Sequence, residues 1–189
     1  MTYSTDNRQV RSSVKRKQRI AVITTSLASK SRSRIAGRYF VTQLEAYGAT
    51  VDWIDLKERP LRGYPLDSED ADVESIVARV HDADAFALAF PIYNWSESGQ
   101  TRDFLAYVLD KKKMKNKVCL LIAGCSTKAS FLVPTDLSRT LQSEIGAVII
   151  GPGILACGDD VDRETGGIKP ELQERLNNGA ELLFRFSKA

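Results

Sequence analysis

The chain of 189 residues is predicted to adopt an α/β fold, in which a parallel sheet is covered by helices on both faces. Two observations predict this fold class. Strand-like and helix-like segments alternate from about residue 19 onward. Four of the five strand-like segments are continuous apolar runs, which is typical of parallel strands buried on both faces.

The element order follows from hydrophobic periodicity, since apolar residues three, four and seven apart mark the helices. The expected strands cover residues 20–23, 51–56, 85–90, 118–124 and 147–151, and the expected helices cover residues 35–48, 72–83, 101–111, 137–146 and a segment starting near 170. Acidic residues interrupt the second strand, which favours an edge position. Five strands fit the spatial order 2-1-3-4-5 better than a six-stranded dinucleotide-binding sheet. The Gly- and Asp-rich segment 151–170 is expected to be an exposed, irregular excursion.

The charge is divided unevenly between a short tail and a single domain. Residues 1–17 hold five basic residues and one acid, a sum of +4, so the net charge of +3 leaves −1 for residues 18–189. We expect residues 1–17 to form a disordered basic tail and residues 18–189 to form one domain. The domain has no basic stripe with interleaved aromatic residues, so nucleic-acid binding is not expected.

Cysteine, histidine and hydropathy patterns narrow the class of protein further. No apolar run is long enough to span a bilayer and no secretory pattern is seen, so a cytoplasmic protein is expected. Cys119, Cys125 and Cys157 have no close pairing, which argues against a disulfide framework or a zinc site. His81 is the single histidine, which excludes a multi-histidine metal site, and its place at a helix end favours a surface role.

In a sheet of this kind the ligand lies at the carboxyl ends of the strands, where the strand order reverses. The loops that follow the first, third and fourth strands begin at about residues 26, 91 and 124. They read SLASKSRSR, PIYNWSESG and GCSTKAS, and we take them as the candidate site.

The first loop is rich in hydroxyls and cations and holds no acid. Ser26, Ser31, Ser33 and Arg34 stand where a helix begins, and a helix N-terminus attracts anions through its free N–H groups. Neither standard phosphate-binding fingerprint is present. The pattern favours an anion site, and a capped helix start with solvated charges is the alternative.

The second and third loops suit a planar ligand. Tyr93 and Trp95 flank Asn94, a residue type that tolerates unusual backbone angles, although a simple turn with two half-buried aromatics would look the same. The third loop offers small residues and free backbone. Cys125 has no histidine partner, and Phe131 stands where a phosphatase loop would need arginine, so a thiol nucleophile is not expected. Because no acid–base pair is evident, a bound redox cofactor fits better than hydrolysis.

Two motifs resemble the NAD(P)H-dependent FMN reductase family of flavodoxin-like proteins, which includes quinone, chromate and azo-dye reductases. The family's first loop reads roughly Ser-Leu-Arg-x-x-Ser-x-Asn/Thr/Ser-Arg, and residues 26–34 match it except at Ala28. The second motif reads Pro-x-Tyr-Asn-x-Ser-x-x-Gly-x-x-Lys-Asn/Asp, and residues 91–103 match it with Arg102 in the lysine position. Element order agrees over about residues 18–187.

The resemblance implies a flavodoxin-like three-layer sandwich that binds FMN and uses NAD(P)H as co-substrate. It implies a phosphate in the first loop and a flavin ring held by the other two, with no catalytic side chain and no metal. The implied cofactor-binding residues are Ser26, Ser31, Ser33, Arg34, Pro91, Ile92, Tyr93, Asn94, Gly124, Cys125 and Ser126. It also implies a homodimer or homotetramer with the flavin near a subunit interface.

Departures from the family pattern bear on the identity of the electron acceptor more than on the identity of the cofactor. Ala28 removes a cation that Lys30 or Arg32 would have to replace, and Trp95 stands in place of a small residue, where it would shape the substrate pocket. The expected reaction passes electrons from NAD(P)H through FMN to a quinone, a free flavin or a similar small acceptor, with a monooxygenase as a conceivable partner. An electron carrier docking to a partner enzyme, and a flavin-free relative, are the alternatives.

Overall fold

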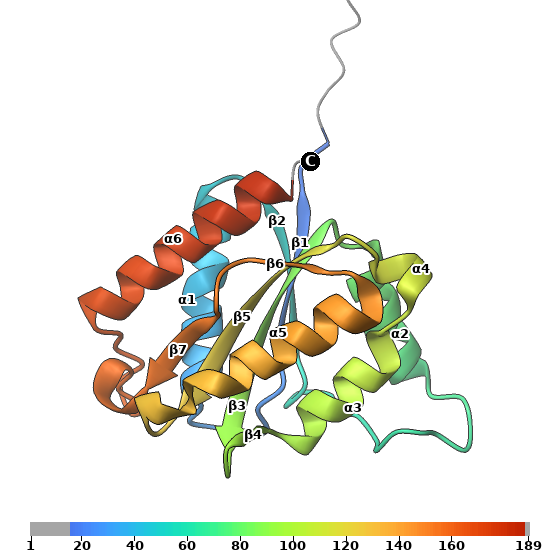
Figure 1. Ribbon diagram of the computed structural model, residues 1–189, viewed down its shortest axis with the longest axis horizontal. Helices are drawn as coiled ribbons and strands as arrows, with labels where there is room; N and C mark the ends of the chain where they lie inside the picture. Colours follow the sequence, from blue (N-terminus) through green and yellow to red (C-terminus); the bar gives the residue numbers. More distant parts are fainter. Residues whose placement is uncertain (1–15, 188–189) are drawn as a thin grey trace, which may run out of the picture.

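The computed structural model describes residues 16–187, and within them seven strands form one sheet (Figure 1). Most of the expected tail at residues 1–17 lies outside the described residues. The strands are β1 (Arg19–Thr24), β2 (Thr50–Asp55), β3 (Ala85–Tyr93), β4 (Ser96–Glu97), β5 (Val118–Cys125), β6 (Val148–Ile149) and β7 (Ile154–Cys157). The helices are α1 (Arg32–Ala46), α2 (Ala71–Asp82), α3 (Gly99–Val108), α4 (Lys111–Met114), α5 (Leu132–Ile145) and α6 (Pro170–Phe186), with short 3₁₀ turns η1 (Lys128–Phe131) and η2 (Gly158–Asp160).

The sheet has the predicted flavodoxin-like order. Its main path runs β2-β1-β3-β5-β6 with parallel neighbours, which is the order 2-1-3-4-5 when the expected strands are counted along the chain. Of the strands within residues 16–187, only the short β4 runs antiparallel, as the second strand of a hairpin with β3. The fold class predicted from the sequence is therefore confirmed.

Two apolar cores lie on the two faces of the sheet. α1 and α6 cover one face side by side, and α2, α3, α4 and α5 cover the other (Figure 1). In β3 the small residues Ala85, Ala87 and Ala89 face α1 and α6, while the large residues between them face the other helices. This alternation lets α1 lie close to the sheet, and a Cβ on Gly37 would come within 3.1 Å of the Ala89 Cβ. Tight packing of α1 fixes the position of its N-terminus.

The fifth strand differs from the prediction. Only Val148 and Ile149 pair with β5, and the chain then turns away through Gly151 and Gly153, whose φ angles are +63° and +87°. It returns as β7, which pairs in parallel with the second half of β5. Part of the segment expected to be an exposed excursion is therefore a buried strand, because positive-φ glycines permit a break that apolar periodicity does not reveal.

The carboxyl ends of β1, β3 and β5 lie at one edge of the sheet, because their registers pair Thr24 with Ala89 and Pro91 with Gly124. The three loops singled out by the sequence therefore emerge side by side. Among residues 16–187, no helix is long and apolar enough to cross a membrane.

Candidate functional site

A cavity of about 150 Å³ opens at this edge, between the N-terminus of α1 and the ends of β3 and β5. Each of the three predicted loops contributes to its wall, and one residue comes from the segment after β7. The lining residues are Ala28, Lys30, Ser31, Arg32, Ser33, Pro91, Ile92, Tyr93, Gly124, Cys125, Ser126 and Arg163. None of these is a carboxylate or a histidine, so the cavity wall is either neutral or cationic.

The start of α1 forms the polar end of the cavity. Ser31 is the N-cap, and its Oγ accepts a hydrogen bond from the Arg34 N–H at 3.3 Å and lies 3.0 Å from the Ser33 Oγ. α1 has no acidic residue in its first turn, where an acid would normally compensate the positive end of the helix dipole. The positive end of the α1 dipole is therefore not compensated by an acid of its own first turn, and it faces the cavity. The helix also begins three residues earlier than its apolar pattern predicts.

Arg34, which the sequence suggested as an anion-binding residue, is not among the residues that line this cavity. Its Nε and Nη2 donate to the Asp55 carboxylate at 2.8 and 3.1 Å, and the two side chains are only 13% and 6% exposed. The guanidinium also donates to the carbonyl oxygens of Ser26 and Ala28. Arg34 thus holds the first loop in place through these two carbonyl oxygens. Its charge is paired with that of Asp55 at the end of β2.

Gly124 lets β5 approach the start of α1. A Cβ at this position would lie 2.7 Å from the Ser33 backbone nitrogen and 3.0 Å from the Ser33 Cβ, closer than nonbonded atoms can come. The sequence placed Gly124 in the site, and the structure shows why no larger residue fits there.

The second loop is a tight hairpin between β3 and β4. Asn94 and Trp95 have φ angles of 50° and 61°, the left-handed pair that two-residue hairpins require. The sequence predicted this only for Asn94. Tyr93 and Trp95 are 53% and 63% exposed, and Glu97 behind them is buried and paired with Arg102. The hairpin therefore presents two aromatic side chains on a fixed backbone.

Buried hydroxyls join the first loop to the second. Thr25 Oγ1 lies 2.8 Å from Thr101 Oγ1, which in turn lies 2.9 Å from Ser98 Oγ, the N-cap of α3. Ser26 is also buried, and its Oγ has no hydrogen-bond partner among residues 16–187. A buried hydroxyl without a partner costs free energy, which a polar ligand would recover.

The cations of the cavity come from two segments. Arg32 uses its Nε to donate to the Gly158 carbonyl at 2.8 Å, and its Nη atoms make no further hydrogen bond within the described chain. Lys30 is paired with Glu164. Arg163 stands on a turn in which Asp162 accepts hydrogen bonds from the Thr165 hydroxyl and from two backbone N–H groups, and these bonds lower the pKa of Asp162. Arg32 and Arg163 therefore leave charge available to an anion.

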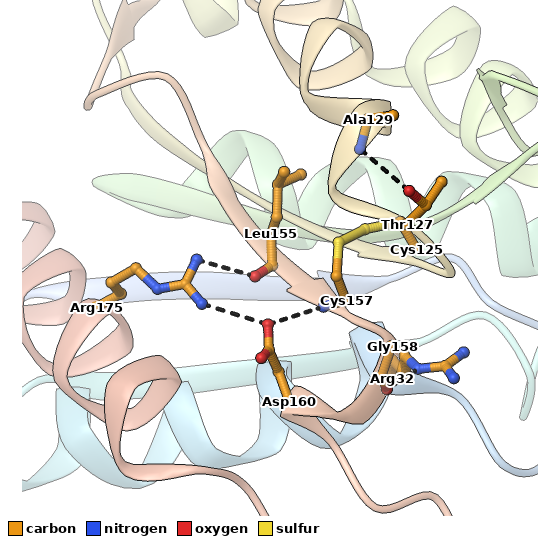
Figure 2. The surroundings of a disulfide bond; sticks show 9 residues. All are labelled: Arg32, Cys125, Thr127, Ala129, Leu155, Cys157, Gly158, Asp160 and Arg175. Carbon is orange, nitrogen blue, oxygen red and sulfur yellow. Dashed lines mark hydrogen bonds and ion pairs between the residues drawn. A yellow bond between two sulfur atoms is a disulfide. The ribbon is translucent and has the colours of Figure 1, made fainter.

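Cys125 and Cys157 form a disulfide, which the spacing of the cysteines did not predict (Figure 2). The two residues end β5 and β7 and are register partners, so the pairing depends on β7 lying next to β5. The third cysteine, Cys119, is fully buried in β5, and burial raises the pKa of its thiol, in agreement with the expected core position. Among the described residues no group of side chains could hold a metal ion.

The structure brings together most of the residues that the sequence singled out. Ser31, Ser33, Pro91, Ile92, Tyr93, Gly124, Cys125 and Ser126 line one cavity. Ser26, Arg34, Asn94 and Trp95 lie next to it without lining it. Arg163 was missed, because its segment has no helical or strand periodicity that would place it at this edge of the sheet.

The chain matches one family model and superposes on several solved structures. A family model described as NADPH-dependent FMN reductase matches residues 18–162. An apo structure titled NADH:FMN oxidoreductase (EMOB) superposes with a TM-score of 0.76 and 19% identity, covering 89% of each chain. FerB, a flavoenzyme NAD(P)H:(acceptor) oxidoreductase from Paracoccus denitrificans, has a TM-score of 0.74 and 16% identity over 90% of this chain and 97% of that one. A flavodoxin from the domain Archaea has a TM-score of 0.66 and 10% identity. At these identities the structures demonstrate a shared fold.

Proposed function

Because the chain belongs to the NADPH-dependent FMN reductase family, we propose that it passes electrons from NAD(P)H, through bound FMN, to a quinone, a free flavin or a similar small acceptor. The single observation that carries this proposal is the cavity at the carboxyl edge of the sheet. It joins a cationic helix N-terminus to an aromatic hairpin and has no acid or histidine in its wall.

The polar end of the cavity suits the phosphate of FMN. The start of α1 supplies free N–H groups, Ser31 and Ser33 supply hydroxyls, and Arg32 and Arg163 supply charge. The Ser26 Oγ is buried, has no partner among the described residues and does not line the cavity, so the phosphate is assigned to the lining residues alone. Arg34 then acts as a positioning residue: by donating to carbonyl oxygens of the first loop, it holds the loop in a conformation in which N–H groups can face the phosphate.

The other end of the cavity suits a flavin ring. Pro91, Ile92 and Tyr93 on one side, and Gly124 to Ser126 on the other, offer backbone groups at the ends of two neighbouring buried strands. When bound, FMN supplies the hydride and electron transfer that no side chain of the cavity could perform. The protein's part is to orient the ring and to leave one side open to NAD(P)H and to the acceptor, where Tyr93 and Trp95 offer exposed aromatic surface.

The test begins with apo-protein titrated with FMN and with riboflavin, which lacks the phosphate, followed by NADH or NADPH oxidation with a quinone and with free flavin. We expect FMN to bind more tightly than riboflavin, NAD(P)H to reduce the bound FMN once when no acceptor is present, and NAD(P)H to be oxidised continuously only when an acceptor is added. A protein that binds FMN but is not reduced by either nicotinamide would instead be an electron carrier. Failure to bind FMN would contradict the proposal entirely.

Arg32→Ala tests the phosphate end of the cavity. Loss of one charged hydrogen bond weakens binding by roughly 1.5–3 kcal/mol, so we expect FMN affinity to fall about ten- to a hundredfold and riboflavin affinity to stay constant. Arg185→Ala removes the same charge near the end of α6 and is the matched control. Equal losses for FMN and riboflavin would show that Arg32 supports the cavity as a whole and does not bind the phosphate.

A further inference from the structure

The Cys125–Cys157 disulfide lies in the wall of the cavity. Cys125 is itself a lining residue, between Gly124 and Ser126, whereas Cys157 lies behind it at the end of β7. The pair is the last register position of the β5–β7 ladder, so Gly158 is the first residue beyond the paired strands. The disulfide is therefore a covalent link between the cavity wall and the end of β7.

The residue after the disulfide holds a cation of the cavity in place. The Gly158 carbonyl accepts the hydrogen bond from the Arg32 Nε at 2.8 Å. The φ angle of Gly158 is +49°, which turns the chain sharply at this residue. On the far side, Asp160 accepts a long bond from the Cys157 N–H and one from Arg175. A continuous path therefore runs from Cys125 through Cys157 and Gly158 to Arg32.

We propose that Cys125 and Cys157 form a reversible redox-modification site that sets the affinity of the cavity for the phosphate of FMN. In the disulfide form the end of β7 is fixed and Gly158 holds Arg32 toward the cavity. In the dithiol form the last pair of the ladder is no longer covalently tied, so the Gly158 carbonyl gains freedom and Arg32 is held less firmly. This inference rests on the proposed function, since it requires FMN in this cavity.

The chemistry of the switch is thiol–disulfide exchange with a small dithiol. A thiolate of the dithiol attacks one cysteine sulfur and forms a mixed disulfide with the protein. The second thiol of the dithiol then attacks this mixed disulfide and releases the protein as a dithiol. One protein S–S bond breaks, one S–S bond forms in the dithiol, and each cysteine gains one hydrogen. The dithiol is oxidised by two electrons and the protein is reduced by two. Cys125 offers the point of attack, because it lines the cavity while both residues are otherwise buried.

Thermodynamic linkage makes this coupling reciprocal. If the disulfide form binds FMN more tightly by some factor, bound FMN favours the disulfide over the dithiol by the same factor. The redox balance of the pair therefore depends on whether the cavity is filled, which gives a second measurement that does not involve catalysis.

The experiment compares apo-protein in the two redox states. Wild-type protein is reduced with dithiothreitol, freed of reductant without air, and titrated with FMN and with riboflavin alongside the oxidised form. We expect the Kd for FMN to rise about fivefold or more on reduction while the Kd for riboflavin stays constant. In a dithiothreitol redox buffer, FMN should increase the fraction of disulfide, as counted by mass spectrometry after thiol alkylation, and riboflavin should leave that fraction unchanged.

Two variants separate the disulfide from general thiol effects. Cys157→Ser should show the weaker FMN affinity in both oxidising and reducing conditions. Cys119→Ala keeps the pair and removes the buried third thiol, so its response to reduction should match that of the wild type. Circular dichroism and riboflavin binding establish that each protein is folded. If Cys157→Ser fails to fold, reduction of the wild type still tests whether FMN affinity depends on the disulfide.

The outcomes distinguish this inference from the proposed function. An oxidised protein that does not bind FMN contradicts the proposed function. An oxidised protein that binds FMN, with an affinity that reduction leaves unchanged or weakens equally for riboflavin, overturns the redox coupling alone.

Discussion

The first loop and the β3–β4 hairpin stand at the same edge of the sheet but are built in opposite ways. At the start of the first loop, Ser26 and the preceding Thr25 are buried, and Arg34 donates hydrogen bonds to two carbonyl oxygens of the loop. The hairpin instead projects Tyr93 and Trp95 into solvent on a backbone with two left-handed residues.

This difference matches the two tasks of the proposed function. A phosphate is small and charged, and it is bound best by donors that are already in place, so the first loop is held rigidly by buried bonds. Acceptors and nicotinamides must enter and leave, so the hairpin side is open. Substitutions in the first loop should therefore change protein stability and FMN affinity together, whereas substitution of the exposed hairpin residue Trp95, which does not line the cavity, should change only substrate handling.

The largest expected effect is that of Asp55→Ala. Removing one partner of a buried ion pair strands the other charge and costs about 3–5 kcal/mol, because Arg34 is only 13% exposed. Chemical denaturation would show this loss, and FMN affinity should fall with it. Arg59→Ala, which breaks the exposed pair with Asp72, is the control and should cost about 0–1 kcal/mol. Similar losses in the two variants would mean that the first loop does not depend on its ion pair.

A smaller effect is expected from Gly124→Ala. The added Cβ would push β5 away from the Ser33 backbone nitrogen, and such overpacking costs about 1–3 kcal/mol. FMN affinity should also fall, because the start of α1 has to shift. Gly99→Ala is the matched control, since nothing lies within 4 Å of its new Cβ. Thermal denaturation and an FMN titration measure both effects, and an unchanged FMN Kd would show that α1 and β5 can separate without harm.

The smallest effect on stability is expected from Trp95→Gly. Glycine adopts the left-handed angle of residue 95 without steric cost and little buried area is lost, so the free energy of unfolding should change by less than about 0.5 kcal/mol. The KM for the quinone acceptor should change while the Kd for FMN stays constant. A large loss of FMN binding would place Trp95 in the cofactor site instead of the acceptor site.

Much of the candidate site could be predicted because parallel strands align their ends. Once five parallel strands, four of them apolar runs, are recognised in the sequence, the loops after the first, third and fourth must meet at one edge of the sheet. Ser31, Tyr93 and Gly124 could therefore be assigned to one site although they lie far apart in the sequence.

Other features depend on contacts between elements that have no periodic signal. The residue types of the first loop predicted Arg34 as an anion ligand, and only the position of Asp55 at the end of β2 shows that Arg34 is paired with an acid inside the protein. Arg163 reaches the cavity from an irregular turn, which no pattern of apolar residues could place.

The sequence by itself determined the alternation of strands and helices, and the fold class that this alternation indicates supplied the strand order and the edge at which the site lies. The hydroxyls at the polar end of the site could be read directly from the first loop. Only the tertiary structure decided that Cys125 meets Cys157, since their pairing requires β7 to return beside β5 after a break at two glycines. It likewise decided that Arg32, and not Arg34, is the cation of α1 that lines the cavity. Such choices depend on which partners are nearest in space, and a linear pattern of residue types does not contain that information.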